Sequence, residues 1–142
     1  MNNVPIKNVS DHKHLGVIFS NNGKWHSHIS SIVKRAWQRI GILRTLKFHL
    51  NRSCLEKLYI TFIRPLLENS DVLWDNCTAD QSNDIESIQI EAARIVTGAT
   101  KLCSIAKLYN DVKWETLSNR RRKHKLILFY KMKHNISPSY LT

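Results

Sequence analysis

Residues 25–46 read WHSHISSIVKRAWQRIGILRTL, and the spacing of their apolar side chains decides the fold class. Apolar residues recur at every third or fourth position, which is the period of one face of an α-helix. They are Trp25, Ile29, Ile32, Ala36, Ile40 and Leu43, with Val33 and Trp37 widening the stripe. The stretch therefore predicts an amphipathic helix over residues 25–46 that buries this stripe. Its opposite side carries Lys34, Arg35, Arg39 and Arg44.

A second helix is predicted to follow, because the sequence from Ser53 to Glu56 matches a capping box. Proline lacks a backbone N–H and disturbs a helix interior, so Pro65 should kink or end this helix. The apolar Leu66 and Leu67 indicate that it resumes before residue 69.

Three more helices are predicted in the C-terminal half. Helical spacing covers residues 84–96, and Gly98 is a typical terminator. Residues 104–110 form a short helix, and the last helix covers residues 115–134. In that last helix Leu117, Leu128 and Met132 are expected to face inward.

Ahead of the first helix the sequence predicts a β-hairpin. Its first strand holds Val4, Ile6 and Val9, its turn lies at Ser10-Asp11, and its second strand covers residues 15–19. We therefore expect a mainly α protein, with a short hairpin over residues 1–23 and a helical domain over residues 24–142.

The composition fits one globular domain: 142 residues, 42% of them apolar and 23% charged. The three cysteines, Cys54, Cys77 and Cys103, lie far apart without a Cys-x-x-Cys pair, which disfavours a disulfide scaffold and a zinc ribbon. The N-terminus does not resemble a secretory signal, and the apolar runs are too short to span a bilayer. We expect an intracellular protein, nuclear or cytoplasmic, with no membrane partner.

The formal net charge is +11, and the charge is unevenly distributed. Residues 24–57 and 92–142 are strongly basic, whereas residues 65–91 contain seven acids and no Lys or Arg. If the two basic blocks fold together, they would line one groove while the acidic block faces away. A basic groove of this kind indicates a polyanionic partner, above all nucleic acid.

The densest charge is the run from Arg120 to Lys125. Cations near a helix N-terminus oppose the helix dipole, so helix stability does not explain them, and we expect an exposed patch that contacts phosphates. A solvated helix start or a nuclear-localisation run is the alternative. The expected contacts are Arg120, Arg121, Arg122, Lys123 and Lys125, with a second patch at Lys34, Arg35 and Arg39.

No set of residues predicts catalysis or metal binding. The seven histidines lack carboxylate or thiol partners at ligand spacing, so surface or part-buried roles are expected for them. The acids Asp84 and Glu86 fit helix N-terminal positions better than a two-metal site. Trp37 is expected in the core, whereas for Trp74 and Trp114 both core packing and base stacking stay open.

Several short segments, in order along nearly the whole chain, resemble one family. They are His14-Leu15-Gly16-Val17; Trp25-His26 with His28-Ile29; Ile63-Arg64-Pro65-Leu66-Leu67-Glu68 with Val72-Leu73-Trp74; Ile88-Gln89, Ala92-Ala93-Arg94 and Thr97-Gly98; and Trp114, Leu117, Arg120-Arg121 and Leu128-Phe129-Tyr130-Lys131. Together they resemble the region after the palm in reverse transcriptases of non-LTR retrotransposons, of the jockey-like, CR1-like and RTE-like kinds. Asn69 stands where that family usually has Tyr.

The resemblance implies the end of a palm followed by a helical thumb, whose role is to hold the template–primer duplex. It also implies that the fingers, the palm and the metal-binding Asp-Asp strand are missing, and the chain contains no Asp-Asp pair. Without those carboxylates two-metal nucleotidyl transfer has no site, and Mg²⁺ would belong to the missing palm.

The first hypothesis is therefore a non-catalytic C-terminal remnant of an RNA-directed DNA polymerase that binds nucleic-acid backbone through basic helices. The alternative is an inactive structural fragment whose exposed apolar face once met the palm. Polymerase activity would require a palm supplied in trans.

Overall fold

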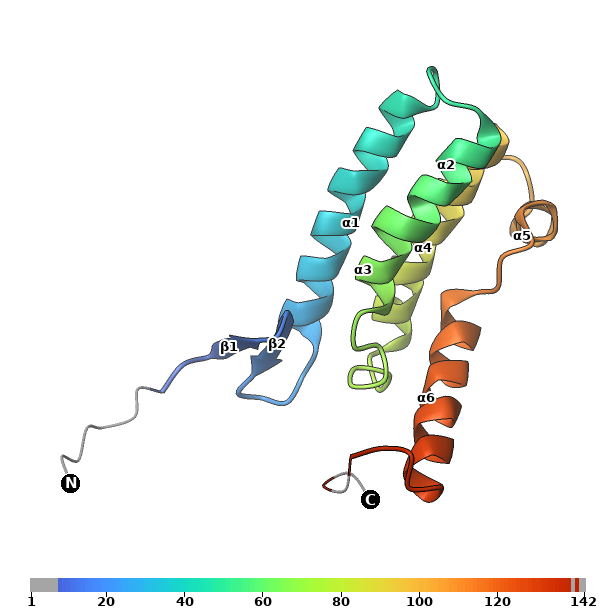
Figure 1. Ribbon diagram of the computed structural model, residues 1–142. Helices are drawn as coiled ribbons and strands as arrows, with labels where there is room; N and C mark the ends of the chain where they lie inside the picture. Colours follow the sequence, from blue (N-terminus) through green and yellow to red (C-terminus); the bar gives the residue numbers. More distant parts are fainter. Residues whose placement is uncertain (1–7, 139, 141–142) are drawn as a thin grey trace, which may run out of the picture.

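The computed structural model describes residues 8–138 and 140, which form a mainly α protein with a short antiparallel hairpin near the N-terminus (Figure 1). This confirms the predicted fold class. The elements are β1 Asp11–His14, β2 Val17–Ser20, α1 His26–Leu46, α2 Arg52–Leu58, the π-helix η1 Tyr59–Ile63, α3 Arg64–Glu68, α4 Ala79–Thr97, α5 Ile105–Val112 and α6 Leu117–Lys133.

The hairpin turns later than predicted. Asp11 pairs with Ser20, so the predicted turn at Ser10-Asp11 is wrong. The chain reverses at Leu15 and Gly16, both with positive φ (47° and 87°), a backbone that suits the twist of a two-residue hairpin loop. The β-like run over residues 15–19 concealed this turn. The predicted strand residues Val4 and Ile6 lie outside the described residues.

Helix α1 confirms the helix predicted over residues 25–46, with one error on its buried face. Trp37 is 39% exposed, so its predicted core position is wrong. Ala36, Ile40 and Leu43 face the core instead, and Trp37 lies about 100° around the helix from Ala36.

The segment from α2 to α3 begins at a different cap from the one predicted. The backbone N–H of Cys54 donates to Oδ1 of Asn51 (2.9 Å), so Asn51 is the N-cap and the capping box at Ser53 is wrong. The predicted interruption at Pro65 takes the form of η1, where the N–H of Arg64 donates to the carbonyl of Tyr59. Proline lacks the donor for the carbonyl four residues earlier and its ring clashes with that carbonyl, and a wide turn just before Pro65 is one way in which a helix adapts to this.

Helix α4 is longer than predicted because its capping box lies at Thr78 and Gln81. The side chain of Thr78 accepts from the N–H of Gln81, and Gln81 accepts from the N–H of Thr78. Asp84 and Glu86 consequently lie inside the helix, not at its start. Gly98 ends α4 in the left-handed conformation (φ 72°), as predicted.

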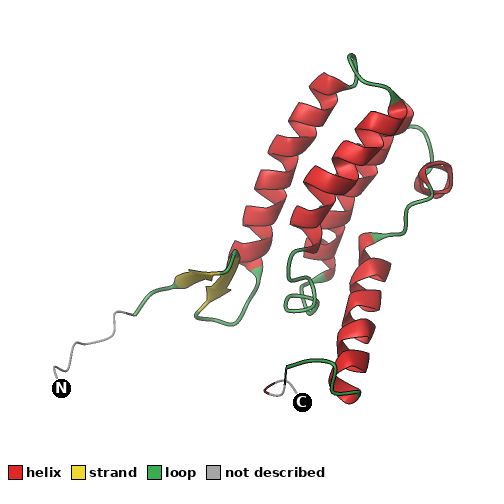
Figure 2. Cartoon of the chain, viewed as in Figure 1, coloured by secondary structure: helices red, strands yellow, loops and turns green. Residues whose placement is uncertain are grey.

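The core lies where α1, the α2–α3 segment and α4 pack side by side (Figures 1 and 2). Its fully buried side chains include Ile32, Ile40, Tyr59, Trp74, Ile85 and Ile88. Helix α6 runs beside this bundle, and its C-terminal part extends below it (Figure 1). Within the described residues, no helix combines the length and the apolar character that crossing a bilayer requires.

Candidate nucleic-acid interface

The basic run on α6 faces the acidic segment that follows α3. The guanidinium of Arg120 binds Glu68 through Nε and Nη2. Nδ1 of His124 lies 2.6 Å from Oδ2 of Asp71, and Nζ of Lys125 lies 2.7 Å from Asp75. The expectation that the acidic block faces away from the basic residues is therefore wrong, because these carboxylates neutralise the run.

Arg121 is buried, so the expectation of an exposed phosphate contact at this position is wrong. Its residue is 4% exposed, and its guanidinium lies over the ring of Trp74, 5.2 Å from the centroid. Nη2 donates to Oγ of Ser82 (2.6 Å), and Nε lies 3.8 Å from Asp75. Arg121 is thus a packing residue that joins α6 to α4 and to the connection before it.

The other two predicted contacts of the run, Lys123 and Arg122, differ in whether a carboxylate neutralises their charge. Lys123 binds Glu115, which lowers the pKa of that carboxyl. Arg122 is exposed and has no carboxylate partner among the described residues. Of the five predicted contacts in the run, Arg122 alone has its charge available to a polyanion.

The three predicted contacts on α1 do not form one patch. Lys34 borders a hollow that α4 also lines through Asp84. Arg39 faces η1 instead, where it donates to the carbonyl of Phe62 and lies 4.4 Å from the centroid of its ring. Nε of Arg35 donates to the carbonyl of Ser31 (3.4 Å) on the same helix. These cations point in different directions although they are close in sequence.

The structure brings other cations together at the far ends of α1 and α4. Here a hollow of about 200 Å³ is lined by Arg44, Lys47, Arg94 and Lys101 around a single carboxylate, Glu91. We call these five residues the basic hollow. Arg44 lies 2.7 Å from Glu91 and Arg94 lies 3.8 Å from it, whereas Lys47 and Lys101 are exposed and have no carboxylate partner among the described residues.

Helix geometry explains why cations gather there. Both α1 and α4 end at the hollow, and the free carbonyls of helix C-termini favour positive charge. The left-handed turn at Gly98 reverses the chain and returns Lys101 to the same place. The two basic blocks thus meet here, which is the condition that we set for a shared basic groove, but they meet through residues other than the predicted contacts. The sequence did contain a signal for this site: Arg44 and Arg94 lie in the last turns of α1 and α4, and Lys47 lies just after the end of α1.

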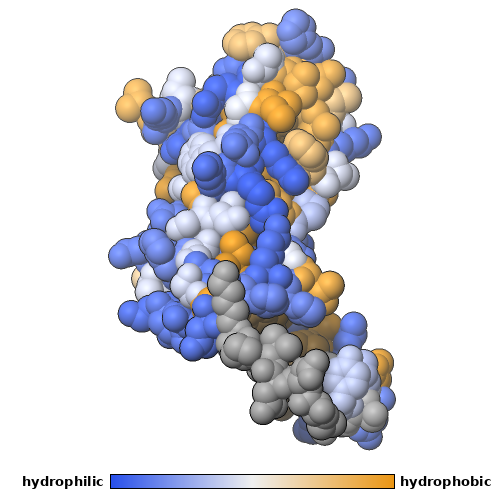
Figure 3. Space-filling model, turned by 90° about the vertical axis from the view of Figure 1, so that its left-hand side faces the viewer, coloured by the Kyte–Doolittle hydropathy of each residue, from blue (hydrophilic) through white to orange (hydrophobic). Residues whose placement is uncertain are grey.

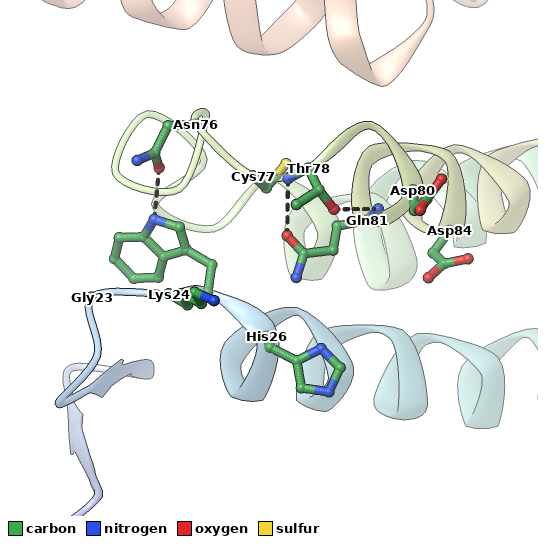
Figure 4. A pocket seen from close by; sticks show the side chains of 10 residues that line it. Gly23, Lys24, His26, Asn76, Cys77, Thr78, Asp80, Gln81 and Asp84 are labelled. Atoms are coloured by element: carbon green, nitrogen blue, oxygen red, sulfur yellow. Dashed lines mark hydrogen bonds between the residues drawn. The ribbon is translucent and has the colours of Figure 1, made fainter.

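A larger hollow of about 650 Å³ lies between the start of α1 and the start of α4 (Figure 4). Nε1 of Trp25 donates to Asn76 across it (2.7 Å), and the Thr78–Gln81 capping pair forms its wall. Acids and bases line it together: Lys24, His26, Asp80 and Asp84. No three His, Cys, Asp or Glu side chains of the described residues lie as a metal would require.

The remaining candidates act as structural partners. Glu86 accepts from the hydroxyl of Tyr109 and from the N–H of Leu117 (2.9 Å), which anchors the start of α6. Trp114 stacks on Tyr59 with 4.3 Å between ring centroids and donates to Glu56 (3.0 Å). Trp74 is fully buried, so its ring is not available for base stacking, and the partly buried Trp114 has one ring face against Tyr59.

The chain matches no protein-family model, no curated protein and no solved structure.

Proposed function

We propose that this chain is a non-catalytic, thumb-like domain that binds the backbone of a nucleic-acid duplex. The observation that carries the proposal is the basic hollow, where four cations from two separate basic blocks surround one carboxylate. The resemblance to the region after the palm of non-LTR reverse transcriptases supports the same partner. Phosphate oxygens are the ligands that such a surplus of positive charge would take.

The contacts that we assign differ from those that the sequence suggested. Lys47 and Lys101 are the main candidates, because they are exposed and their charges are not neutralised by described carboxylates. Lys34, Arg35 and Arg122 add further positive charge elsewhere on the surface. Arg120, Lys123 and Lys125 are left out, since each already binds a carboxylate.

The proposed role is binding and not polymerisation. Two-metal nucleotidyl transfer needs carboxylates that converge on the metal ions, and the chain has no Asp-Asp pair. Three carboxylates of the acidic block, those of Asp71, Asp75 and Glu86, bind His124, Lys125 and Tyr109 in this fold. If the chain belongs to a polymerase, its Mg²⁺ would be held by another domain.

An apolar groove favours the second candidate function, a structural fragment that packs against a palm. The groove of about 200 Å³ lies between α1 and η1 and is lined by Arg39, Ile42, Leu43, Leu46, Leu58, Phe62 and Ile63. Figure 3 shows apolar residues gathered at the upper right, over the side on which α2 lies. Ile42 and Phe62, which line this groove, are exposed. A fragment of this kind would bind no duplex.

The test is a salt titration of the affinity for a B-form DNA duplex, by fluorescence anisotropy. We compare the wild type with a Lys47→Gln, Lys101→Gln variant. Each lost phosphate contact lowers the slope of log affinity against log salt by about 0.9, so the double variant should lose about 1.8. An RNA–DNA hybrid measured in parallel reports the preferred duplex.

The matched control is a Lys13→Gln, Lys57→Gln variant, which removes two exposed lysines that also have no carboxylate partner among the described residues. Its net charge equals that of the test variant, so a general charge effect would change both slopes equally. Equal slopes would refute the assignment to the hollow. Absence of salt-dependent binding in the wild type would refute the function and favour the structural fragment.

A further inference from the structure

The C-terminal half of α6 exposes large apolar side chains to solvent. Leu126, Phe129 and Tyr130 are 57%, 65% and 57% exposed. They are three and four positions apart, so they lie on one face of the helix. This part of α6 extends below the bundle, where no other described helix covers it (Figure 1). A helix with so much apolar surface ordinarily buries it against a partner.

Two free cations lie on this apolar face, one toward each end of it. Arg122 lies one turn before Leu126, and Lys133 lies one turn after Phe129, so both share the side of the helix that carries the apolar residues. Both are exposed, and neither has a carboxylate partner among the described residues. The face therefore combines an apolar centre with a cation at each end.

The first half of the same helix shows what kind of surface such a face binds. It packs on residues 68–75, which read ENSDVLWD and combine acids with a buried tryptophan. Arg121 lies over the ring of Trp74, while Arg120 and Lys125 bind carboxylates of this segment. Arg120, Arg121 and Lys125 each face a carboxylate of this segment, and the contact with Trp74 lies among them. The second half of α6 repeats the chemistry without the acidic segment.

We propose that this outer face of α6 binds an acidic amphipathic helix of a partner protein. The face comprises Arg122, Leu126, Phe129, Tyr130 and Lys133. Apolar anchors three and four residues apart match recognition between amphipathic helices, and the cations at the two ends of the face select acidic flanks. This inference is independent of the proposed nucleic-acid function.

Two other occupants fit the face less well. A second copy would bring the same cations, and two chains of net charge +11 repel each other. A nucleic acid would use the cations and the rings of Phe129 and Tyr130, but it would leave the aliphatic Leu126 in water. An acidic amphipathic helix covers both the apolar and the charged groups.

The experiment measures binding of the whole chain to a labelled helical peptide of about 18 residues, with Leu and Phe along one face and Glu elsewhere. A peptide of the same composition with its apolar residues scattered around the helix is the second probe. Two variants test the face: Leu126→Ala with Phe129→Ala, and Arg122→Gln with Lys133→Gln. The control variant is Leu102→Ala with Ile105→Ala, two exposed apolar residues outside α6.

We expect the amphipathic peptide to bind and the scattered peptide to bind at least about tenfold more weakly. The apolar variant should lose about tenfold or more in affinity, and the variant without the two cations should lose affinity mainly at low salt. The control variant should bind the peptide with the affinity of the wild type. All variants should have the melting temperature of the wild type, because the changed residues are exposed.

Equal affinity for the two peptides would overturn the proposal, since charge alone would then explain the binding. It would also be overturned by self-association of the wild type in sedimentation that Phe129→Ala abolishes, which would assign the face to a second copy. Oligo-dT binding that Phe129→Ala abolishes, with no binding of the amphipathic peptide, would assign it to single-stranded nucleic acid.

Discussion

The burial of Arg121 makes a sharp prediction about stability. Replacing it with glutamate removes the cation over Trp74, breaks the hydrogen bond to Ser82 and places a carboxylate beside Asp75. Breaking a buried ion pair by replacing one partner costs about 3–5 kcal/mol. For a chain of this size that loss lowers the melting temperature by about 10–15 °C.

Arg121→Met separates the charge from the packing. Methionine keeps most of the apolar stem, and Asp75 retains its ion pair with Lys125. What is lost is the hydrogen bond to Ser82 and the cation–π contact, about 1–2 kcal/mol together. The variant also removes Nε and Nη1, which are buried without hydrogen-bond partners. The methionine variant should therefore be clearly more stable than the glutamate variant.

The assay is urea denaturation of both variants, with Arg122→Glu as the control at the neighbouring exposed position. A surface charge reversal there should change the free energy of unfolding by no more than about 0.5 kcal/mol. If Arg121→Glu were as stable as Arg122→Glu, the buried position of Arg121 and the docking of α6 would both be wrong.

Two further predictions concern local contacts. The buried ring of His28 accepts the N–H of Ile18 on Nδ1 (3.2 Å), and burial lowers its pKa below the ordinary 6.5. The unfolded chain therefore takes up this proton first, so the contribution of His28 to stability is complete above about pH 6.5 and is lost as the pH falls below that value. His28→Asn, whose side-chain oxygen can still accept from Ile18, should have a flatter pH dependence of unfolding between about pH 5 and 6.5; identical slopes would contradict this account. Asn51→Ala should lower the free energy of unfolding by about 1 kcal/mol, because it removes the N-cap of α2. Ser53→Ala should lower it much less in the same denaturation assay. The reverse order would mean that the cap is at Ser53, as the sequence predicted.

Local sequence determined the helices well. The apolar period over residues 25–46 gave α1 almost to the residue, because burial on one face fixes the spacing of apolar side chains. Gly98 marked the end of α4 because a glycine accepts the left-handed conformation at little cost. The cap at Asn51 was missed because Ser, Thr, Asn and Asp all serve as caps, so sequence alone did not separate it from Ser53.

Only the tertiary structure decided which charges remain free. The sequence located two basic blocks and one acidic block, but a run of charges does not indicate what lies opposite to it in space. Arg121 and Arg122 are adjacent in sequence, yet a step of about 100° around the helix buries one against Trp74 and leaves the other in solvent. The basic hollow likewise depends on α1 and α4 packing side by side, a long-range contact that brings Lys47 and Lys101 to one surface.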